Sequence, residues 1–223
     1  MKITIDGPAG SGKSFIARGV SKELGIPYLE TGLAYRAVAY ALLREKKEIR
    51  SVSWEDVKPV VEELFLTPRI GSTEVFLRGE SVKREELASE EVGKVASLVG
   101  TISPFRERIN VTFRSIVGDG QAVIEGRDAG TRIFPDAEVK LFITASPLER
   151  ARRRWAQLKG SGSEESLSSI LKKIKDRDER DTKREDSPLV PAYDAFVIDT
   201  TDLSPEESLR IALEIIKKHE KRT

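Results

Sequence analysis

Eight consecutive residues near the start of the chain, GPAGSGKS at positions 7–14, have the types and spacing of a phosphate-binding loop. In the pattern GxxxxGK(S/T), glycines let backbone N–H groups curl around phosphate oxygens. The lysine reaches the β- and γ-phosphates of a nucleotide, and the serine hydroxyl binds Mg²⁺. We therefore expect this loop to bind a nucleoside triphosphate through Gly7, Pro8, Ala9, Gly10, Ser11, Gly12, Lys13 and Ser14, with Ser14 as the metal ligand.

Two arginines lie in loops that follow predicted strands, where a second phosphate would need positive charge. Arg36 belongs to TGLAYR and Arg127 to EGRDAGT. Parallel strands present their carboxyl ends at one edge of a sheet, so both arginines are expected on the same edge as the loop. Phosphoryl transfer depends mainly on positioning and charge stabilisation, so this arrangement favours a phosphotransferase over a simple nucleotide-binding turn.

Asp128 directly follows Arg127 and places a carboxylate at the same strand end. A carboxylate there can cap a helix or pair with a neighbouring cation. It can also accept a hydrogen bond from the exocyclic amine of cytosine. The last reading favours an amine-bearing base over uracil, and the residue types alone leave all three open.

The segment KDRDERDTKRED at 175–186 has the alternating charges of a solvated helix. Arg177, Arg180 and Arg184 nevertheless recur at i, i+3 and i+7 and so project from one side of a helix. A small-residue stretch, GSGS, precedes them. The spacing is equally compatible with an exposed face and with a mobile lid that delivers arginines to phosphates on closure.

Composition excludes several other kinds of site. The 223 residues carry a net charge of +1 and no cysteine, so thiolate zinc sites, disulfides and a cysteine nucleophile are excluded. The only asparagine, Asn110, is followed by VTF, which disfavours the NKxD motif of a guanine-nucleotide switch. One short basic stretch at 149–159 in a neutral chain is a weak indication of nucleic-acid binding. We expect a cytoplasmic, monomeric protein with no nucleic-acid or membrane partner.

Apolar runs and helical periodicities alternate along the chain. Strands are predicted at 2–6, 28–32, 121–126, 139–145 and 195–200, and helices at 13–25, up to 45, and at 90–117, 147–159, 164–181 and 205–220. The β-rich stretch 64–87 interrupts this order and is interpreted as part of an inserted subdomain. Strands separated by helices predict an α/β fold with a doubly wound parallel sheet, whose ligands bind at the strand carboxyl ends.

Taken together, IDGPAGSGKS, TGLAYR, EGRDAGT, FPDAEVKLFITASPLERARRR, RDERD and SPLVPAYDAFVIDTT resemble the bacterial cytidylate kinase family over nearly the whole chain. The resemblance implies a P-loop nucleoside monophosphate kinase that transfers the γ-phosphoryl group of ATP to CMP or dCMP with Mg²⁺. It also implies one domain with a five-stranded parallel core (about 1–50, 90–158 and 190–223), a nucleotide-monophosphate-binding insert (about 55–90) and a lid (about 159–189).

The resemblance assigns roles residue by residue. Lys13, Arg127, Arg177 and Arg184 are the expected catalytic cations, and Arg153 resembles the arginine that packs on the donor adenine. The acceptor nucleotide is expected to contact Arg36 and Arg127 through its phosphate, Ser97, Arg106 and Asp128 through cytosine, and Arg177 and Asp181 through the sugar. Thr31 is also expected among the residues that bind the acceptor nucleotide.

The chain departs from the family pattern at three positions. Phe15 stands where threonine is frequent, at a position that can face the core. Glu30 replaces a common aspartate. Ala88 occupies the place of an arginine, so one acceptor contact is either missing or supplied by Lys83 or Arg84. A kinase for UMP, AMP or a small alcohol, and a nucleotide-dependent binding protein, are the alternatives.

Overall fold

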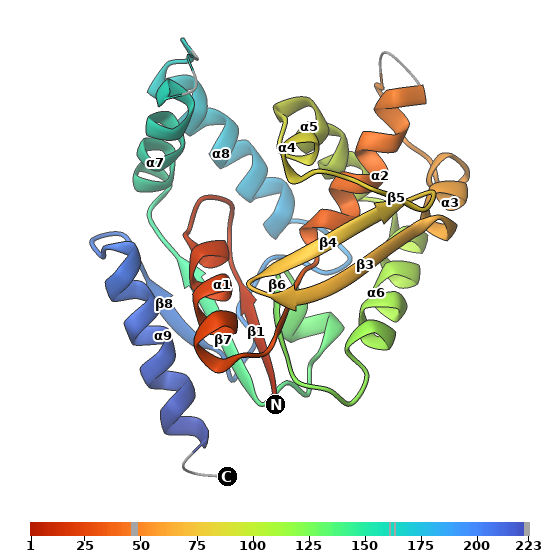
Figure 1. Ribbon diagram of the computed structural model, residues 1–223. Coiled ribbons are helices and arrows are strands. Elements are labelled where there is room, and N and C mark those ends of the chain that lie inside the picture. Colours follow the sequence, from red (N-terminus) through yellow and green to blue (C-terminus); the bar gives the residue numbers. More distant parts are fainter. Residues whose placement is uncertain (46–48, 161, 163, 221–223) are drawn as a thin grey trace.

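The structure is a computed structural model, and it describes residues 1–45, 49–160, 162 and 164–220. The GSGS stretch at 160–163 therefore lies partly outside the described residues, as do small parts of the expected core segments 1–50 and 190–223. Figure 1 shows the order and arrangement of the elements.

Five neighbouring parallel strands form one side of the sheet, and these five strands were predicted. Their order is β2-β6-β1-β7-β8 within the described residues. The strands are β1 (Lys2–Asp6), β2 (Pro27–Glu30), β6 (Ala122–Gly126), β7 (Val139–Thr144) and β8 (Phe196–Asp199). The central strand β1 pairs with β6 and β7, and the chain reverses its winding direction beside it. Ligands of doubly wound sheets bind at such a reversal.

Helices cover both faces of the sheet, because successive apolar side chains of a buried strand point to opposite sides. Val123 packs in a cluster with α1 (Lys13–Leu24) and α9 (Pro205–Glu220). The next residue, Ile124, packs in the other cluster, with α2 (Gly32–Glu45) and α6 (Ser103–Val117). The doubly wound α/β prediction is therefore confirmed.

The inserted segment extends the same sheet. It comprises α3 (Trp54–Glu62), β3 (Leu64–Ile70), β4 (Ser72–Leu77), β5 (Glu80–Ser81), α4 (Arg84–Leu87) and α5 (Glu90–Val99). Strand β3 pairs antiparallel with β2, so the described residues form one sheet in the order β5-β4-β3-β2-β6-β1-β7-β8. The core sheet therefore has an antiparallel extension in addition to its five predicted strands.

Two helical predictions need correction. The single helix expected over 90–117 is divided into α5 and α6, because Gly100 ends the first helix and Pro104 occupies the first turn of the second. Helix α3 was not predicted, since Pro59 lies inside it and proline disfavours helix interiors. Its start carries a capping box between Ser53 and Asp56, which is the signal that indicates the helix.

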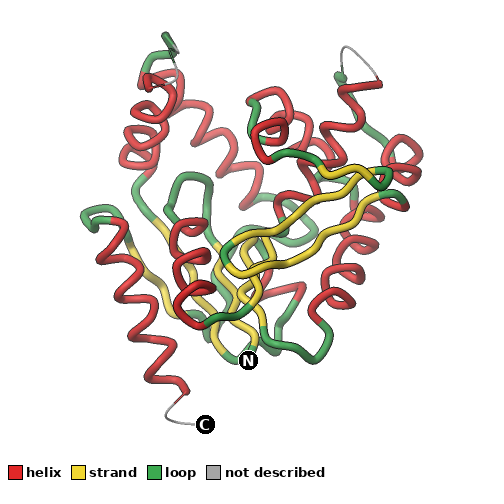
Figure 2. Tube along the Cα trace, in the orientation of Figure 1, coloured by secondary structure: helices red, strands yellow, loops and turns green. Residues whose placement is uncertain are grey.

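Helices α7 (Pro147–Gly160) and α8 (Leu167–Thr182) form a hairpin above the strand ends. The hairpin has a small apolar cluster of its own, built on Ala151, Ile170 and Ile174. In Figure 2 this hairpin and the helices of the insert rise as two lobes on either side of the loop between β1 and α1. None of the described helices combines the length and the apolar character that a membrane-spanning segment requires.

Candidate active site

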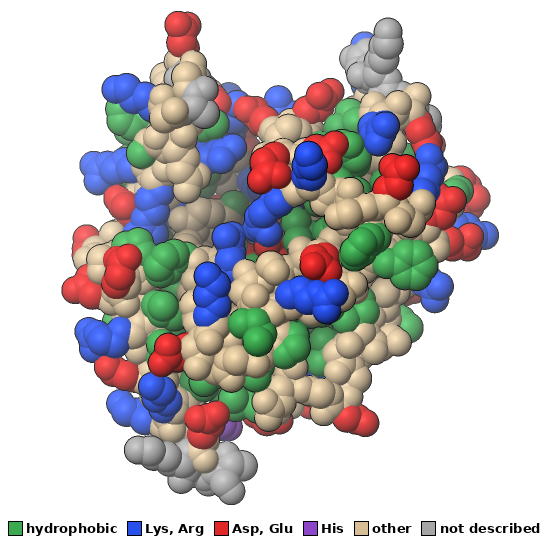
Figure 3. All heavy atoms as spheres, viewed as in Figure 1, with side chains coloured by type: hydrophobic (Ala, Val, Ile, Leu, Met, Phe, Trp, Pro, Cys, Tyr) green, Lys and Arg blue, Asp and Glu red, His purple; other side chains and the backbone are tan. Residues whose placement is uncertain are grey.

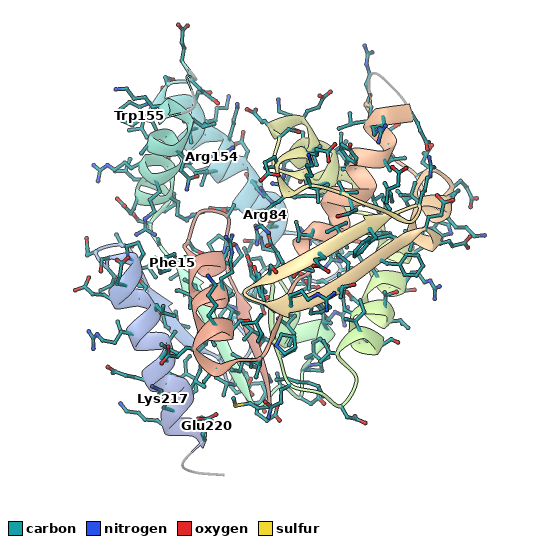
Figure 4. All side chains as sticks on the ribbon, viewed as in Figure 1. Phe15, Arg84, Arg154, Trp155, Lys217 and Glu220 are labelled. Carbon is teal, nitrogen blue, oxygen red and sulfur yellow. The ribbon has the colours of Figure 1, made fainter. Side chains whose placement is uncertain are left out.

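A cleft of about 1110 Å³ lies at the carboxyl ends of β1, β2 and β6, between the α7–α8 hairpin and the insert. Figure 3 shows the molecule hollowed between these two lobes, with Lys and Arg side chains along the margin. Basic side chains outnumber acidic ones in its lining, and they are Lys13, Arg18, Arg36, Arg84, Arg106, Arg127, Arg153, Arg154, Arg177 and Arg184. Arg84 and Arg154 come from opposite walls, α4 and α7 (Figure 4). Such a cleft suits a polyanionic ligand.

The loop 7–14 joins β1 to α1 in a conformation that requires glycine. Gly7, Gly10 and Gly12 have φ values of 149°, 78° and 90°. A Cβ on Gly7 would lie 2.0 Å from the carbonyl oxygen of Ile143, so no other residue fits there. Gly12 precedes α1 without any side-chain cap, which leaves the first N–H groups of the helix open to an anion.

Lys13 and Ser14 meet a buried carboxylate at the start of α1. The Lys13 ammonium donates to the carbonyl oxygen of Pro8 at 3.1 Å and lies 3.8 Å from Glu125 Oε1. Ser14 Oγ donates to the same Glu125 oxygen at 2.7 Å. Burial, together with Arg127, lowers the pKa of Lys13 to about 7. An anionic phosphate would favour its charged form.

Glu125 was not singled out in the sequence, although it is the one charged residue in the apolar run QAVIEG. It lies on β6 with 5% of its surface exposed. Tyr28 donates a short hydrogen bond to its other oxygen and lies 3.1 Å from Glu30 Oε2, which also accepts from Arg84 at 2.6 Å. A chain of polar contacts therefore joins Ser14 on α1 to Arg84 on α4.

Arg150, another residue that sequence reasoning missed, fixes the α7–α8 hairpin to the phosphate-binding loop. Its guanidinium donates to the carbonyl oxygens of Ala9 and Ala145 and makes a bidentate contact with Asp178 on α8, at 3.0 and 2.6 Å. Only 3% of its surface is exposed. The basic stretch 149–159 indicates that an arginine of this helix can reach the site, but its sequence does not distinguish the buried Arg150 from its exposed neighbours.

Arg153, the predicted adenine contact, is held beside the same loop. It donates to the side-chain and backbone oxygens of Thr200 at 3.1 and 2.5 Å, and Thr200 Oγ1 in turn donates to the Ser11 carbonyl. Its guanidinium lies 3.9 Å from the position of a Cβ on Gly12. The Arg153 side chain therefore lines the donor end of the cleft.

Three predicted arginines converge on one carboxylate in the cleft. Asp181 accepts from Arg184 at 2.5 Å and from Arg127 at 3.4 Å, and Arg177 Nε lies 3.8 Å away. Burial acts to raise the pKa of Asp181, but the three arginines hold it below its usual value. The cations outnumber their carboxylate, so the group keeps a net positive charge for an anionic ligand.

Arg180 is a correction within the same helix. It was predicted on one side with Arg177 and Arg184, but it does not line the cleft, and its Nε donates to the Asp176 carbonyl on the exposed surface. The i, i+3 step leaves a helical residue about 60° away from its partner, and Arg177 and Asp181, four apart, take the inward face.

Asp128 is turned toward a second buried cation. Its Oδ2 accepts from Arg106 Nη2 at 2.5 Å, and the Arg106 guanidinium lies 5.7 Å from the centre of the Tyr35 ring. Only 4% of Asp128 and 3% of Arg106 is exposed. Ser97 lines the cleft beside them. The Asp128 side chain makes no cap bond to the helix that follows, so of the two structural roles considered for it the local ion pair is the one present.

Arg36 and Thr31 stand at the wall nearest the insert. Arg36 Nη1 donates to the Leu87 carbonyl at 2.6 Å, while Thr31 Oγ1 donates to the Glu125 carbonyl at 2.8 Å. Ala88 lines the cleft beside Leu87, and Arg84, one turn earlier, also lines it. Phe15 is 46% exposed and lines the donor side (Figure 4), so the expectation that it can face the core is wrong.

The structure brings nearly all the predicted site residues into this single cleft. Those that line it are Ala9, Gly10, Ser11, Gly12, Lys13, Ser14, Thr31, Arg36, Ser97, Arg106, Arg127, Asp128, Arg153, Arg177, Asp181 and Arg184. Gly7 and Pro8 belong to the same loop but do not line the cleft. The Pro8 carbonyl instead accepts hydrogen bonds from Lys13 and Ser11 within the loop.

Comparison with known proteins agrees with this geometry. The sequence model of a family described as Cytidylate kinase matches residues 3–218. A cytidylate kinase of Aquifex aeolicus is 53% identical over 97% of this chain and 96% of its own length, and one of Desulfitobacterium hafniense is 41% identical over 93% and 88%. The crystal structure of an uncharacterized protein from Eubacterium ventriosum, 14% identical, covers 97% of this chain and 98% of its own with a TM-score of 0.52, a likeness of fold alone. The chain belongs to the cytidylate kinase family.

Proposed function

We propose that the chain transfers the γ-phosphoryl group of ATP to CMP or dCMP, giving ADP and CDP or dCDP. The observation that carries this proposal is one cleft, in a chain of the cytidylate kinase family, that holds a phosphate-binding loop at one end and the Arg106–Asp128 pair at the other. The first feature suits a triphosphate, and the second suits a base with an exocyclic amine.

The donor phosphates are held by the loop 7–14. The open N–H groups at the start of α1 and the Lys13 ammonium neutralise the β- and γ-phosphate oxygens, and Arg153 lies where the adenine leaves the loop. Lys13 exchanges its contact with the Pro8 carbonyl for a phosphate oxygen, which restores its full charge.

The residues around Ser14 fit Mg²⁺. Ser14 Oγ–H donates a hydrogen bond to Glu125, so the Oγ lone pairs remain for a hard cation, and Glu125 adds a second oxygen group close by. The described residues hold no cluster of three His, Cys, Asp or Glu side chains, which suits a metal bound mainly by phosphates and water. When bound, Mg²⁺ supplies charge neutralisation at the transferring phosphate.

The acceptor nucleotide binds at the insert side of the cleft. Arg36 and Arg127 hold its 5′-phosphate, and Arg177 with Asp181 contacts its sugar, beside Arg184. Asp128 accepts from the cytosine amine while Arg106 and Ser97 flank the ring. The phosphate monoester is anionic at neutral pH and attacks the γ-phosphorus in line without a strong general base. Arg127, Arg177 and Arg184 then face the charge that develops during transfer.

We also propose that residues 159–189 act as a lid and 55–90 as the acceptor-binding insert on a core of 1–50, 90–158 and 190–223. Helix α8 of this segment carries Arg177 and Asp181 to the cleft, which supports the lid, and Ile170 and Ile174 pack it against Ala151 of α7. Because every site residue comes from one chain, a monomer is sufficient for the reaction.

The test is ADP release from Mg-ATP with CMP, dCMP, UMP and AMP in parallel and a blank without acceptor. Turnover confined to CMP and dCMP is the expected result. Turnover mainly with UMP or AMP would keep a kinase and reject the cytosine assignment. ATP binding without any acceptor-dependent turnover would reject the kinase and favour a nucleotide-dependent binding protein.

A further inference from the structure

A short π-helical turn, η1 (Ala129–Ile133), follows β6 and carries Asp128 at its start. The first N–H groups of any helix have no acceptor within the helix and need one from outside. Here the Asp128 carbonyl accepts from Thr131, Arg132 and Ile133, which leaves the N–H groups of Ala129 and Gly130. The aspartate that precedes a helix usually accepts such bonds through its own side chain.

Asp128 does not cap η1, because its carboxylate is turned away from the turn and toward Arg106. The missing cap comes from another strand. Asp6, the last residue of β1, accepts from Ala129 N–H through Oδ1 at 2.9 Å and from Gly130 N–H through Oδ2 at 2.7 Å. Both oxygens of this 5%-exposed carboxylate therefore serve the start of η1.

We propose that Asp6 is a positioning residue for base recognition: by capping η1 in place of Asp128, it keeps the Asp128 carboxylate turned into the cleft. The inference rests on the proposed function, in which Asp128 accepts from the cytosine amine. Without Asp6, we expect the Asp128 side chain, which directly precedes the two uncapped N–H groups, to accept from them, fold back onto the turn and leave the cleft.

The backbone around Arg127 and Asp128 packs tightly against the Asp6 carboxylate. A Cβ on Gly126 would lie 2.9 Å from Thr31 Oγ1 and 3.3 Å from Asp6 Oδ1, and a Cβ on Gly130 would lie 2.7 Å from Thr4 Oγ1 and 3.4 Å from Asp6 Oδ2. Because Gly126 and Gly130 have no side chain, the backbone before Arg127 and after Asp128 can lie close to the Asp6 carboxylate. Since β1 runs directly into the phosphate-binding loop, the same residue fixes the acceptor turn relative to the donor loop.

The experiment measures kcat/KM for CMP and for UMP in Asp6→Ala, Asp6→Asn and Asp128→Ala. We expect Asp6→Ala to lower the CMP:UMP ratio at least tenfold, approaching the ratio of Asp128→Ala. Asp6→Asn keeps one acceptor oxygen but opposes the second N–H with its own amide, so a smaller loss is expected. The KM for Mg-ATP should change less than twofold, because the loop 7–14 keeps its own hydrogen bonds.

A double variant distinguishes positioning from general loosening. If Asp6 acts through Asp128, adding Asp6→Ala to Asp128→Ala lowers the CMP:UMP ratio no further, whereas independent effects multiply. Asp56→Asn is the matched control, since Asp56 also accepts backbone N–H bonds at a helix start but lies outside the cleft. It should leave the ratio unchanged.

The outcomes separate the two proposals. A wild-type chain that does not prefer CMP overturns the proposed function before any variant is made. A CMP-selective wild type with an unchanged ratio in Asp6→Asn and Asp6→Ala overturns the Asp6 inference and leaves the function intact. Thermal unfolding of each variant checks folding, and Asp6→Asn decides the matter if Asp6→Ala does not fold.

Discussion

The two ends of the cleft are built in different ways. The donor end is one contiguous loop, whose open backbone N–H groups and glycine geometry suit an anion. The acceptor end is assembled from side chains of α2, α6, the β6–η1 turn and α8, and it is held by ion pairs such as Arg106–Asp128 and Arg184–Asp181. A local site is determined by a short sequence, whereas a dispersed site depends on the whole fold and on mutual charge neutralisation.

The largest expected effect is at the donor end. Lys13→Ala should lower kcat by about 10³-fold, because it removes a buried cation from the transferring phosphate. The KM for CMP should change little if the two ends are independent. Lys22→Ala, an exposed lysine in the last turn of the same helix, is the control. A comparable loss in both variants would contradict the assignment. Steady-state ADP release measures the effect.

A smaller effect is expected at the acceptor end. Arg177→Ala should lower kcat/KM for CMP by about 10- to 100-fold while the KM for ATP stays near the wild-type value. Other arginines remain around Asp181, so the loss is partial. Arg180→Ala on the same helix faces solvent and should leave both parameters unchanged. If the two variants behave alike, Arg177 has no role in the reaction.

Arg150 joins the donor loop to α8, because it contacts Ala9 in the loop and Asp178 on the helix. Its removal should therefore affect both ends of the cleft. Arg150→Ala leaves Asp178 without its bidentate partner and frees the Ala9 carbonyl, so the free energy of unfolding should fall by about 2 kcal/mol. We also expect KM to rise for both ATP and CMP, since the hairpin is no longer fixed to the loop. Arg152→Ala, exposed on the same helix, is the matched variant for urea unfolding. Equal stability of the two would refute this role.

The last expected effect is a pH dependence of stability. Burial, with help from Asp128, raises the pKa of Asp6 to about 7, although the Ala129 and Gly130 N–H groups and Arg127 oppose the shift. Between about pH 4 and pH 7 the folded chain therefore holds a proton that the unfolded chain has lost. Stability from this group is complete below about pH 4 and is lost as pH rises to 7, at up to about 1.4 kcal/mol per pH unit.

Urea unfolding of the wild type and Asp6→Asn across this range isolates that contribution, because other titrating groups are common to both. The difference in unfolding free energy between the two should change steadily from pH 4 to pH 7 and level off above it. A difference that is constant with pH would show that Asp6 stays ionised throughout.

The same contrast explains what could be predicted from sequence. The loop 7–14 and the five parallel strands were predicted because their patterns are local, in glycine spacing and in short apolar runs. The break between α5 and α6 was missed although Gly100 and Pro104 signal it, since the apolar periodicity continues across them. Thr31, Ser97, Arg106 and Asp181 were predicted for the acceptor site only through the family resemblance, whereas residue type and spacing had already pointed to the other four acceptor-site residues.

A single sequence does not show which distant residues contact each other, as three residues of this site illustrate: Glu125, Arg150 and Asp6. Each acts on a group more than a hundred residues away along the chain: Glu125 on Ser14, Arg150 on Ala9 and Asp6 on Gly130. Residue type and spacing carry no information on such pairs until the strands are placed side by side.

The antiparallel extension of the sheet has a mechanical consequence. In the described sheet, β2 and β3 are joined over two residue pairs, Pro27 with Ile70 and Tyr28 with Arg69, whereas neighbouring strands of the parallel core are joined over three to five. The β2–β3 seam is therefore narrower than any joint between strands of the parallel core, so a swing of the insert toward the donor loop would bend the sheet there. The insert wall of the cleft is joined to the parallel core through these two residue pairs. The opposite wall, the α7–α8 hairpin, is held to the loop 7–14 by the Arg150 guanidinium.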